Sequence, residues 1–360
     1  MSEVDKRAVD ALVSVLGQAA GATLTLRREQ GGRLAVSYGT STSILIPVWA
    51  GEGYPQDVRA ALRRLPERGP RPGESPVIVA SQMSPGGRSM LLAQSLSWAD
   101  ARGAAHVRAE PGLVVVVDGR EVPQPQRRRL GVAWTPGAGA VAELLLARAQ
   151  LERATSRGDM RLPTVTELAD ALHASPTVAS TALRMFDAEG WTAKKGPQRG
   201  PAAVRFLTDP SAMLSSWVRW YRETPRDSVE AHALVRDGEV FLEREIARVW
   251  RHLWWAATGP VALERRAPFL TAIPVVDLYA DLPSAEAEVD DLLQGAGLRR
   301  VERGARVRVH RADRYLRAVT PPTNDVVPIV SDVRLYGDLM RVGGREEEAA
   351  DHLRETRIGF

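Results

Sequence analysis

The sequence contains no cysteine among its 360 residues. This excludes disulfide frameworks, zinc sites with thiolate ligands and cysteine nucleophiles, and it fits a reducing compartment. No apolar run approaches the roughly 20 residues that a membrane span requires, and the first residues lack the basic and then apolar pattern of a signal peptide. We therefore expect a cytoplasmic protein with no membrane partner.

Lysine is nearly absent as well. Only Lys6, Lys194 and Lys195 occur, so arginine supplies nearly all of the 48 basic residues. The net charge is only +4, but it is unevenly distributed. Residues 127–206 contain 12 Lys and Arg against 7 Asp and Glu, whereas residues 207–360 contain 22 against 25. A basic segment between less basic neighbours indicates a polyanionic partner for that segment.

The pattern of apolar residues divides the chain into three segments. Residues 1–120 show the order α-β-β-β-α-β-α-β-β, which is typical of a compact α/β domain with a central sheet. A stretch rich in proline, glycine and arginine near 121–139 marks a boundary. The last segment shows a mixed α/β pattern that ends in two helices around a Gly-Gly break. We therefore predict an α/β multi-domain protein with domains at 1–125, 126–207 and 208–360.

Residues 164–188 have the spacing of a helix-turn-helix. Thr164 and Glu167 form the pattern of a capping box at the start of a short helix. Ser175 as N-cap and Pro176 at the first helical position then begin a second helix, and Gly190 ends it. Short hydroxyl side chains and one arginine remain outward on the second helix, which suits a helix in a major groove. These DNA-binding candidates are Ser175, Thr177, Ser180, Thr181 and Arg184.

Residues 191–207 predict a β-wing, because two short strand patterns flank a basic turn. Lys194, Lys195, Gln198 and Arg199 lie at or near the tip. Two of the three lysines in the chain occur here, and cations on a wing contact the phosphate backbone. The central segment therefore predicts a winged helix-turn-helix that binds double-stranded DNA. A winged helix that serves only as a structural or protein-binding module is the alternative.

The element order of the first segment resembles the restriction-endonuclease-like core. An active member of that group carries an acidic residue on one strand and an acidic-x-Lys pattern on the next, so that the carboxylates bind a divalent metal. The strand that should hold this pattern, residues 44–49, contains neither an acid nor a lysine. We therefore predict a degenerate nuclease-like domain. Asp100 and His106 have no partner motif, and we interpret them as a turn former and a surface residue.

The last segment lacks the motifs of common nucleotide chemistry. No Gly-Ser turn precedes an acidic pair on a strand, although Asp277 and Asp281 flank a strand pattern and Asp290 and Asp291 follow on a helix. No Walker loop, dinucleotide fingerprint or HExxH motif occurs. The tryptophans at helical spacing favour core packing over base stacking; they are Trp217, Trp220, Trp250, Trp254 and Trp255. We expect no catalytic residue, no metal and no cofactor.

Residues 76–107, the winged helix and residues 328–355 together resemble the AbiEi-type antitoxins of type IV toxin–antitoxin systems. The stretch PIVSDVRLYGDLMRVGGREEEAADHLRE is the most suggestive part. The resemblance implies a bacterial transcriptional repressor that binds operator DNA and opposes a nucleotidyltransferase toxin without a stable complex between the two. This chain departs from the common form, because its winged helix is central and a nuclease-like domain precedes it.

These observations favour a regulator that is not an enzyme and that binds a specific DNA sequence, as an autorepressing antitoxin and as a homodimer. Two alternatives stay open at this point. One is a metal-dependent nuclease or nucleotidyltransferase that the winged helix targets to DNA. The other is a non-enzymatic DNA-maintenance or scaffold protein.

Overall fold

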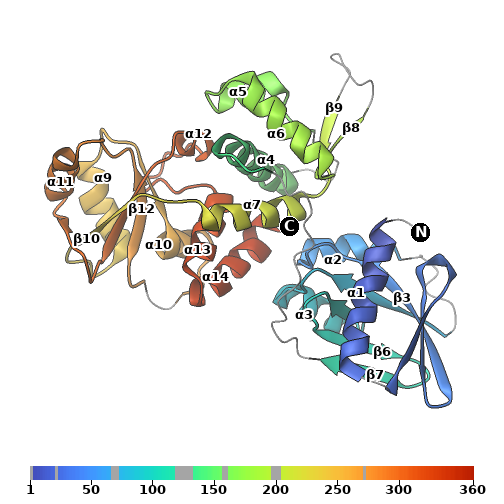
Figure 1. Cartoon of the computed structure of the whole chain (residues 1–360). Coiled ribbons are helices and arrows are strands. Elements are labelled where there is room, and N and C mark those ends of the chain that lie inside the picture. The colour runs from blue at the N-terminus through green and yellow to red at the C-terminus, as the bar shows by residue number, and fades with distance from the viewer. Residues whose placement is uncertain are drawn as a thin grey trace. The chain divides into compact units, whose positions relative to one another are not determined.

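The computed structural model describes residues 3–20, 23–65, 73–117, 133–155, 161–195, 204–270 and 273–360. The chain splits into two compact units (Figure 1), which are considered separately. The first comprises Met1–Gly131 and is assigned the last two residues, and the second comprises Val132–Ile358. The second unit thus contains both the central and the C-terminal segments that the sequence distinguishes.

The described part of the first unit is built from one sheet and three α-helices. Its elements are α1 (Glu3–Ala20), β1 (Thr25–Arg28), the short 3₁₀ turn η2 (Gln30–Gly32), β2 (Leu34–Tyr38), β3 (Ser41–Trp49), α2 (Pro55–Leu62), β4 (Glu74–Ala80), α3 (Pro85–Ala93), β5 (Ser97–Asp100), β6 (Ala105–Ala109) and β7 (Leu113–Val117). The seven strands lie in the sheet in the order of the sequence. The pairs β3–β4 and β4–β5 are parallel and the others are antiparallel.

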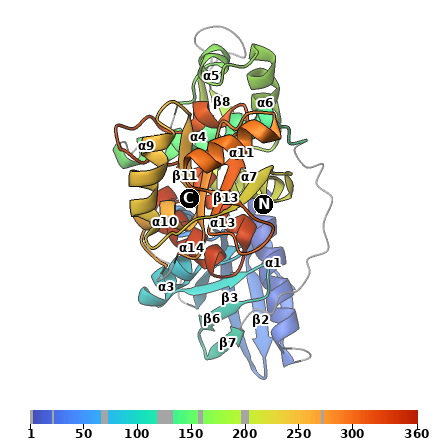
Figure 2. The same cartoon turned by 90° about the vertical axis from the view of Figure 1, so that its left-hand side faces the viewer.

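Helices cover both faces of this sheet. Val77 and Val79 pack in one apolar cluster with Leu12 of α1, whereas Ile78 packs in a second cluster with Val58 of α2 and with residues of α3. Figure 2 shows α1 and α3 on opposite sides of the strands. The alternation arises because successive side chains of a strand point to opposite faces, and a parallel strand that is covered on both faces is apolar throughout.

The observed order contains one strand that the sequence pattern missed. β5 has only four residues, and all of them are buried. At its end, Asp100 accepts hydrogen bonds from the amides of Arg102 and Ala104, each at 3.0 Å, and from the amide of Met83 at 3.1 Å. Asp100 is therefore a turn former, as predicted. The strand β3 contains no acid and no lysine, and the assignment to an endonuclease-like core stays a prediction.

The second unit begins with the segment for which the sequence predicts a winged helix and continues into a second sheet. Its elements are α4 (Pro136–Thr155), α5 (Val165–Ala171), α6 (Pro176–Ala188), β8 (Thr192–Lys195), β9 (Val204–Leu207), α7 (Pro210–Glu223), β10 (Ser228–His232), α8 (Gly238–Phe241), the π-helical turn η3 (Leu242–Ile246), α9 (Ala247–Val249), β11 (Trp255–Thr258), α10 (Gly259–Arg266), β12 (Val276–Ala280), α11 (Glu286–Gly295), β13 (Arg299–Arg300), β14 (Val307–Arg311), α12 (Leu316–Val319), α13 (Asp332–Val342), α14 (Arg345–Leu353) and the π-helical turn η4 (Arg354–Ile358). Gly343 and Gly344 have positive φ angles between α13 and α14, which confirms the predicted Gly-Gly break.

The second sheet has the strand order β11-β12-β14-β10-β13. Only the pair β12–β14 is parallel. Because Tyr279 pairs with His310 and Asp277 with Thr258, these side chains share one face, and that face is polar and buried. The opposite face carries apolar residues such as Leu278. The strand β10 was not distinguished by the mixed sequence pattern.

The Asp338 carboxylate of α13 accepts hydrogen bonds from side chains on this polar face of the sheet and from its neighbours. One of its oxygens accepts hydrogen bonds from the hydroxyls of Tyr221 and Tyr279 at 2.7 and 2.8 Å and from Arg226 at 2.7 Å. The other accepts from Thr258 at 2.6 Å. Burial alone would raise the pKa of Asp338, but nearby guanidinium groups outweigh it and lower the pKa. Asp338 is therefore buried in its charged form. Its hydrogen bonds and its ion pair offset the cost of burying that charge.

Candidate nucleic-acid interface

The first helix of the helix-turn-helix begins as the sequence predicts. The Thr164 hydroxyl accepts a hydrogen bond from the Glu167 amide at 3.2 Å, and the Glu167 carboxylate accepts one from the Thr164 amide at 2.7 Å. The predicted capping box is therefore confirmed. The bond from the Thr164 amide lowers the pKa of Glu167, and a negative charge at this end favours the helix.

The turn and the second helix also lie where the sequence places them, with one difference. Pro176 occupies the first turn of α6, and Gly190 follows the helix with a φ of +74°. His173 adopts a positive φ of 47° in the turn between the helices. Ser175 stands at the N-cap position, but its side chain makes no capping hydrogen bond. Its hydroxyl is exposed and so is not committed to the helix.

The helix α6 divides into a buried and an exposed face. The buried residues are Ala179, Ala182, Leu183 and Phe186. Thr177, Thr181 and Arg184 are exposed, and Ser180 is half-buried. The Arg184 guanidinium donates a hydrogen bond to the Thr181 hydroxyl at 3.2 Å. Because residues 177, 181 and 184 follow one another at helical spacing, they form one polar stripe along α6.

The wing is fastened to α6 by an ion pair that the sequence analysis did not find. Arg205 of β9 donates two hydrogen bonds to the Asp187 carboxylate, at 2.9 and 2.8 Å, and the Thr192 hydroxyl of β8 donates a third at 2.6 Å. Burial raises the pKa of Asp187, but these hydrogen bonds outweigh it and lower the pKa. The pairing could have been suspected only from an acid near the end of α6 and an arginine 18 residues later.

The basic residues of the wing lie partly within the described structure. β8 and β9 pair in antiparallel register, with Lys194 opposite Arg205 and Lys195 opposite Val204. The Lys194 side chain is exposed. Lys195 is the last residue of β8. Gln198 and Arg199 lie outside the described residues.

An aromatic cluster packs the helix-turn-helix against α7. The ring of Trp134 lies 5.8 Å from that of Phe186, 6.0 Å from that of Trp191 and 5.6 Å from that of Trp220, measured between centroids. Offset packing at these separations adds to the gain from burial alone. Trp134 falls in the stretch that the sequence analysis treated as a domain boundary, so its packing role was not predicted.

The helix α4 packs against α6 and also against α7, α12 and α13 of the second unit. Glu143 is fully buried and accepts hydrogen bonds from Arg334 of α13 at 2.7 and 3.0 Å and from the Ser331 hydroxyl at 2.8 Å. The Trp217 indole of α7 donates to the Gly139 carbonyl at 3.1 Å. A Cβ at position 139 would lie 2.4 Å from the Trp220 ring, so only glycine permits this close approach.

The tryptophans are divided between the core and half-buried positions. Trp217 and Trp250 are 1% exposed, and Trp255 is also buried, which confirms the prediction of core packing for these three. Trp220 and Trp254 are half-buried. Trp220 belongs to the aromatic cluster around Trp134, whereas Trp254 lines a surface hollow.

Within the part of the chain that the structure describes, no group of three His, Asp or Glu side chains is arranged to hold a metal ion. Over the same residues, no helix combines the length and the apolar character that a membrane crossing requires.

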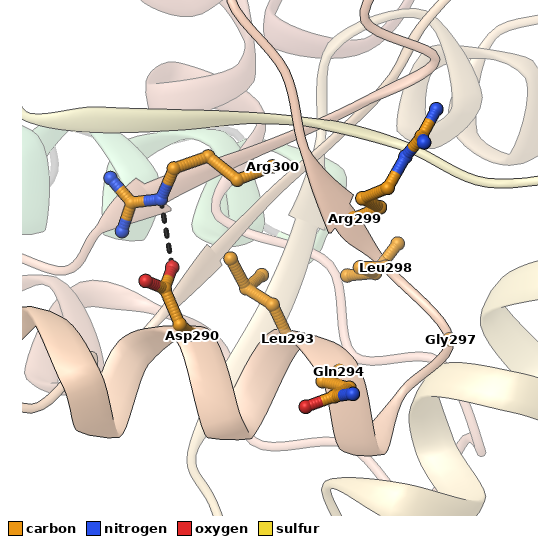
Figure 3. Close-up of a pocket in the computed structure, with 7 residues that line it drawn as sticks. All are labelled: Asp290, Leu293, Gln294, Gly297, Leu298, Arg299 and Arg300. Carbon is orange, nitrogen blue, oxygen red and sulfur yellow. Dashed lines mark hydrogen bonds and ion pairs between the residues drawn. The ribbon is translucent and has the colours of Figure 1, made fainter.

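A hollow of about 490 Å³ lies beside the end of α11 and the edge strand β13 (Figure 3). Its apolar floor includes Leu293 and Leu298, and Arg300 donates a hydrogen bond to Asp290 at 2.8 Å. Arg299 points away from Asp290 in Figure 3. Because Arg300 also pairs with Glu286 at 2.6 Å, the charges at this rim are largely compensated. The hollow does not continue the polar stripe of α6.

Comparison with known proteins finds a similarity in the C-terminal region. Residues 206–358 match the model of the family described as "Transcriptional regulator, AbiEi antitoxin, Type IV TA system". No curated protein and no solved structure matches the chain. The matched region begins in β9 and extends to η4, so it follows α5 and α6 and covers less than half of the chain.

The match confirms one part of the resemblance expected from the sequence. The stretch 328–355 lies inside it, whereas the stretch 76–107 and the helix-turn-helix lie outside it. The family description names a transcriptional regulator and an antitoxin, and it names no catalytic activity. The second unit therefore contains a region similar to a family of regulators and, before it, the helices α5 and α6.

Proposed function

We propose that this protein is a sequence-specific DNA-binding regulator that represses its own promoter as a type IV antitoxin. One observation carries the proposal. The stripe of Thr177, Thr181 and Arg184 is polar and exposed on the second helix of a helix-turn-helix, which is the helix that enters the major groove in this motif. The similarity of residues 206–358 to a family of regulators supports the same conclusion.

The dimensions of the stripe fit the reading of a few base pairs. Residues 177 to 184 span about 10 Å along the helix at 1.5 Å per residue, which corresponds to about three base pairs. Short threonine side chains allow the helix backbone to approach the bases closely. The Arg184 guanidinium can donate two hydrogen bonds to guanine, the commonest specific contact in the major groove.

The wing supplies sequence-independent affinity. Lys194 is exposed on β8, and the ion pair between Asp187 and Arg205 fixes the wing strands relative to α6. A cation held in this way would contact a phosphate beside the groove that α6 enters. The excess of basic over acidic residues in 127–206 has the sign that a DNA partner requires.

Two partners follow from the proposal. A homodimer would place two copies of α6 on half-sites one helical turn apart, about 10 base pairs from centre to centre. A nucleotidyltransferase toxin would be the functional partner, opposed without a stable complex between the two proteins.

Nuclease footprinting on the DNA upstream of the protein's own gene tests the proposal. We expect protection of two half-sites with that spacing, and loss of protection with Arg184→Ala at concentrations where the wild type protects fully. Arg303→Ala is the matched control, because Arg303 is exposed between β13 and β14 of the same unit. Uniform protection without half-sites, or an unchanged footprint with Arg184→Ala, would contradict the proposed reading of bases by α6.

A further inference from the structure

A second hollow, also of about 490 Å³, lies in the region that matches the regulator family. Residues around α9, among them Trp250, Arg251 and Trp254, form one side. The other side is formed by α12 and the segment after it, including Arg317 and Pro321. A cavity of this size is within the range that small ligands occupy. Two arginines line it and no acidic residue does.

Trp254 presents an aromatic surface to this hollow. Trp250, Trp254 and Trp255 all line the cavity, but Trp250 and Trp255 are buried, whereas Trp254 is half-buried. A half-buried indole that is held in place by packed neighbours is a rigid stacking platform. Any nucleobase can stack on such a ring, because every base has a π-face.

The two arginines of the hollow carry uncompensated charge. Arg251 and Arg317 are both exposed, and within the described residues neither forms an ion pair with a carboxylate. The Arg251 side chain donates a hydrogen bond to His252 at 3.0 Å. Arg300 and Arg311 of the same unit, in contrast, are paired with acidic residues. The positive charge of these two arginines therefore favours an anionic ligand in the hollow. Guanidinium groups bind phosphate well.

We infer that this hollow binds a phosphorylated nucleotide. The base stacks on Trp254, and the phosphate groups accept hydrogen bonds from Arg251 and Arg317. The occupant combines a planar ring with negative charge, which matches both features of the lining. A proline-rich peptide would also stack on an exposed tryptophan, but it would leave the two guanidinium charges unused.

The hollow is connected to the DNA-binding helix through α12. Tyr315 immediately precedes α12, which carries Arg317. A Cβ at Gly137 of α4 would lie 3.4 Å from the Tyr315 hydroxyl and 2.6 Å from Val178 of α6. One layer of packed atoms therefore separates α12 from α6. A nucleotide that draws Arg317 toward its phosphate acts on this layer, so it should change the affinity for DNA; this effect, unlike nucleotide binding, rests on the proposed function.

Titration of the full chain with nucleotides, followed by calorimetry and by tryptophan fluorescence, tests the inference. The probes are AMP, ATP, adenosine, which lacks phosphate, and tripolyphosphate, which lacks a base. We expect saturable binding of the two nucleotides and quenched fluorescence that Trp254→Leu abolishes. Because each charge-assisted contact contributes substantially, Arg251→Ala or Arg317→Ala should weaken binding about tenfold or more. Arg303→Ala should leave it unchanged.

Several results would overturn the inference. They are an absence of saturable nucleotide binding, adenosine binding as tightly as AMP, tripolyphosphate binding as tightly as ATP, and arginine variants that bind ATP like the wild type. Binding of a proline-rich peptide that is insensitive to both arginine variants would assign the hollow to a peptide instead. If the protein binds nucleotide but not DNA, the nucleotide site is supported and the proposed regulatory function is contradicted. If it binds DNA but not nucleotide, only the nucleotide site is contradicted.

Discussion

Replacing Glu143 by glutamine should destabilise the second unit strongly. Glu143 is fully buried, and its partner Arg334 is only 7% exposed. Removing one charge of a buried pair costs about 3–5 kcal/mol, because the other charge remains in the interior. We expect the lower end, about 3 kcal/mol. A glutamine oxygen can still accept the bond from Ser331, and Arg334 keeps its 2.9 Å contact with Asp313.

Thermal unfolding measured by calorimetry checks this value. For a unit of this size, about 3 kcal/mol corresponds to a fall in the melting temperature of about 6–12 °C. Glu152→Gln is the control, since Glu152 is exposed on the same helix, and exposed pairs contribute at most about 1 kcal/mol. The double variant Glu143→Gln, Arg334→Met should recover part of the loss, because it leaves no unpaired charge in the interior; Asp313, which loses Arg334, is 45% exposed.

Equal melting temperatures for Glu143→Gln and Glu152→Gln would refute the reasoning. So would a double variant whose loss equals the sum of the two single losses, because independent residues are additive and a coupled pair is not. Either outcome would mean that α4 is stabilised against the matched region, residues 206–358, by its packing on α7 and not by the buried pair.

Three further predictions concern the wing and the first unit. Lys194→Ala should weaken binding to every DNA sequence about equally and lower the salt slope by about one, as salt-series titrations on two unrelated duplexes would measure; a sequence-dependent loss would assign Lys194 to base reading. Because the folded pKa of Asp187 is lowered, the stability that it contributes is present above its unfolded pKa of about 3.9 and is lost as the pH falls through the folded value. Denaturant unfolding should therefore show a gap between wild type and Asp187→Asn that is constant at neutral pH and shrinks below about pH 4; a gap that persists there would exclude a role for the charge. Supercoiled plasmid should stay intact with Mg²⁺ or Mn²⁺, because β3 has no acid or lysine for the metal-dependent reaction; nicking that depends on the protein would reverse this conclusion.

The helix-turn-helix could be predicted from the sequence almost residue by residue. The capping box at Thr164, Pro176 at the start of α6 and Gly190 after it are local signals, and each depends only on neighbouring residues. The exposed stripe followed from helical periodicity once these bounds were known. Two details differ: Ser180, expected to be outward, is half-buried, and Ser175 makes no capping bond, because the N-cap position does not fix the rotamer of the side chain.

Contacts between distant segments could not be predicted in the same way. Glu143 and Arg334 are separated by 191 residues, and no sequence pattern connects them, so only the packed structure shows their pairing. The four residues of β5 are too few for a periodic pattern. The packing of Trp134 could not be predicted, because the proline and glycine residues around it indicate a linker. In the structure its ring packs against Phe186 of α6.

The central claim is that α6 reads a specific DNA sequence. Fluorescence anisotropy of the full chain on its own upstream DNA and on scrambled DNA of equal length, across a salt series, tests it most directly. We predict a dissociation constant on the order of 10 nM or tighter for the upstream DNA. We also predict that the preference over scrambled DNA persists as salt is raised, because salt weakens the phosphate contacts to both duplexes but not the contacts to base edges. Equal affinity for both duplexes at every salt concentration, or no binding, would contradict the account.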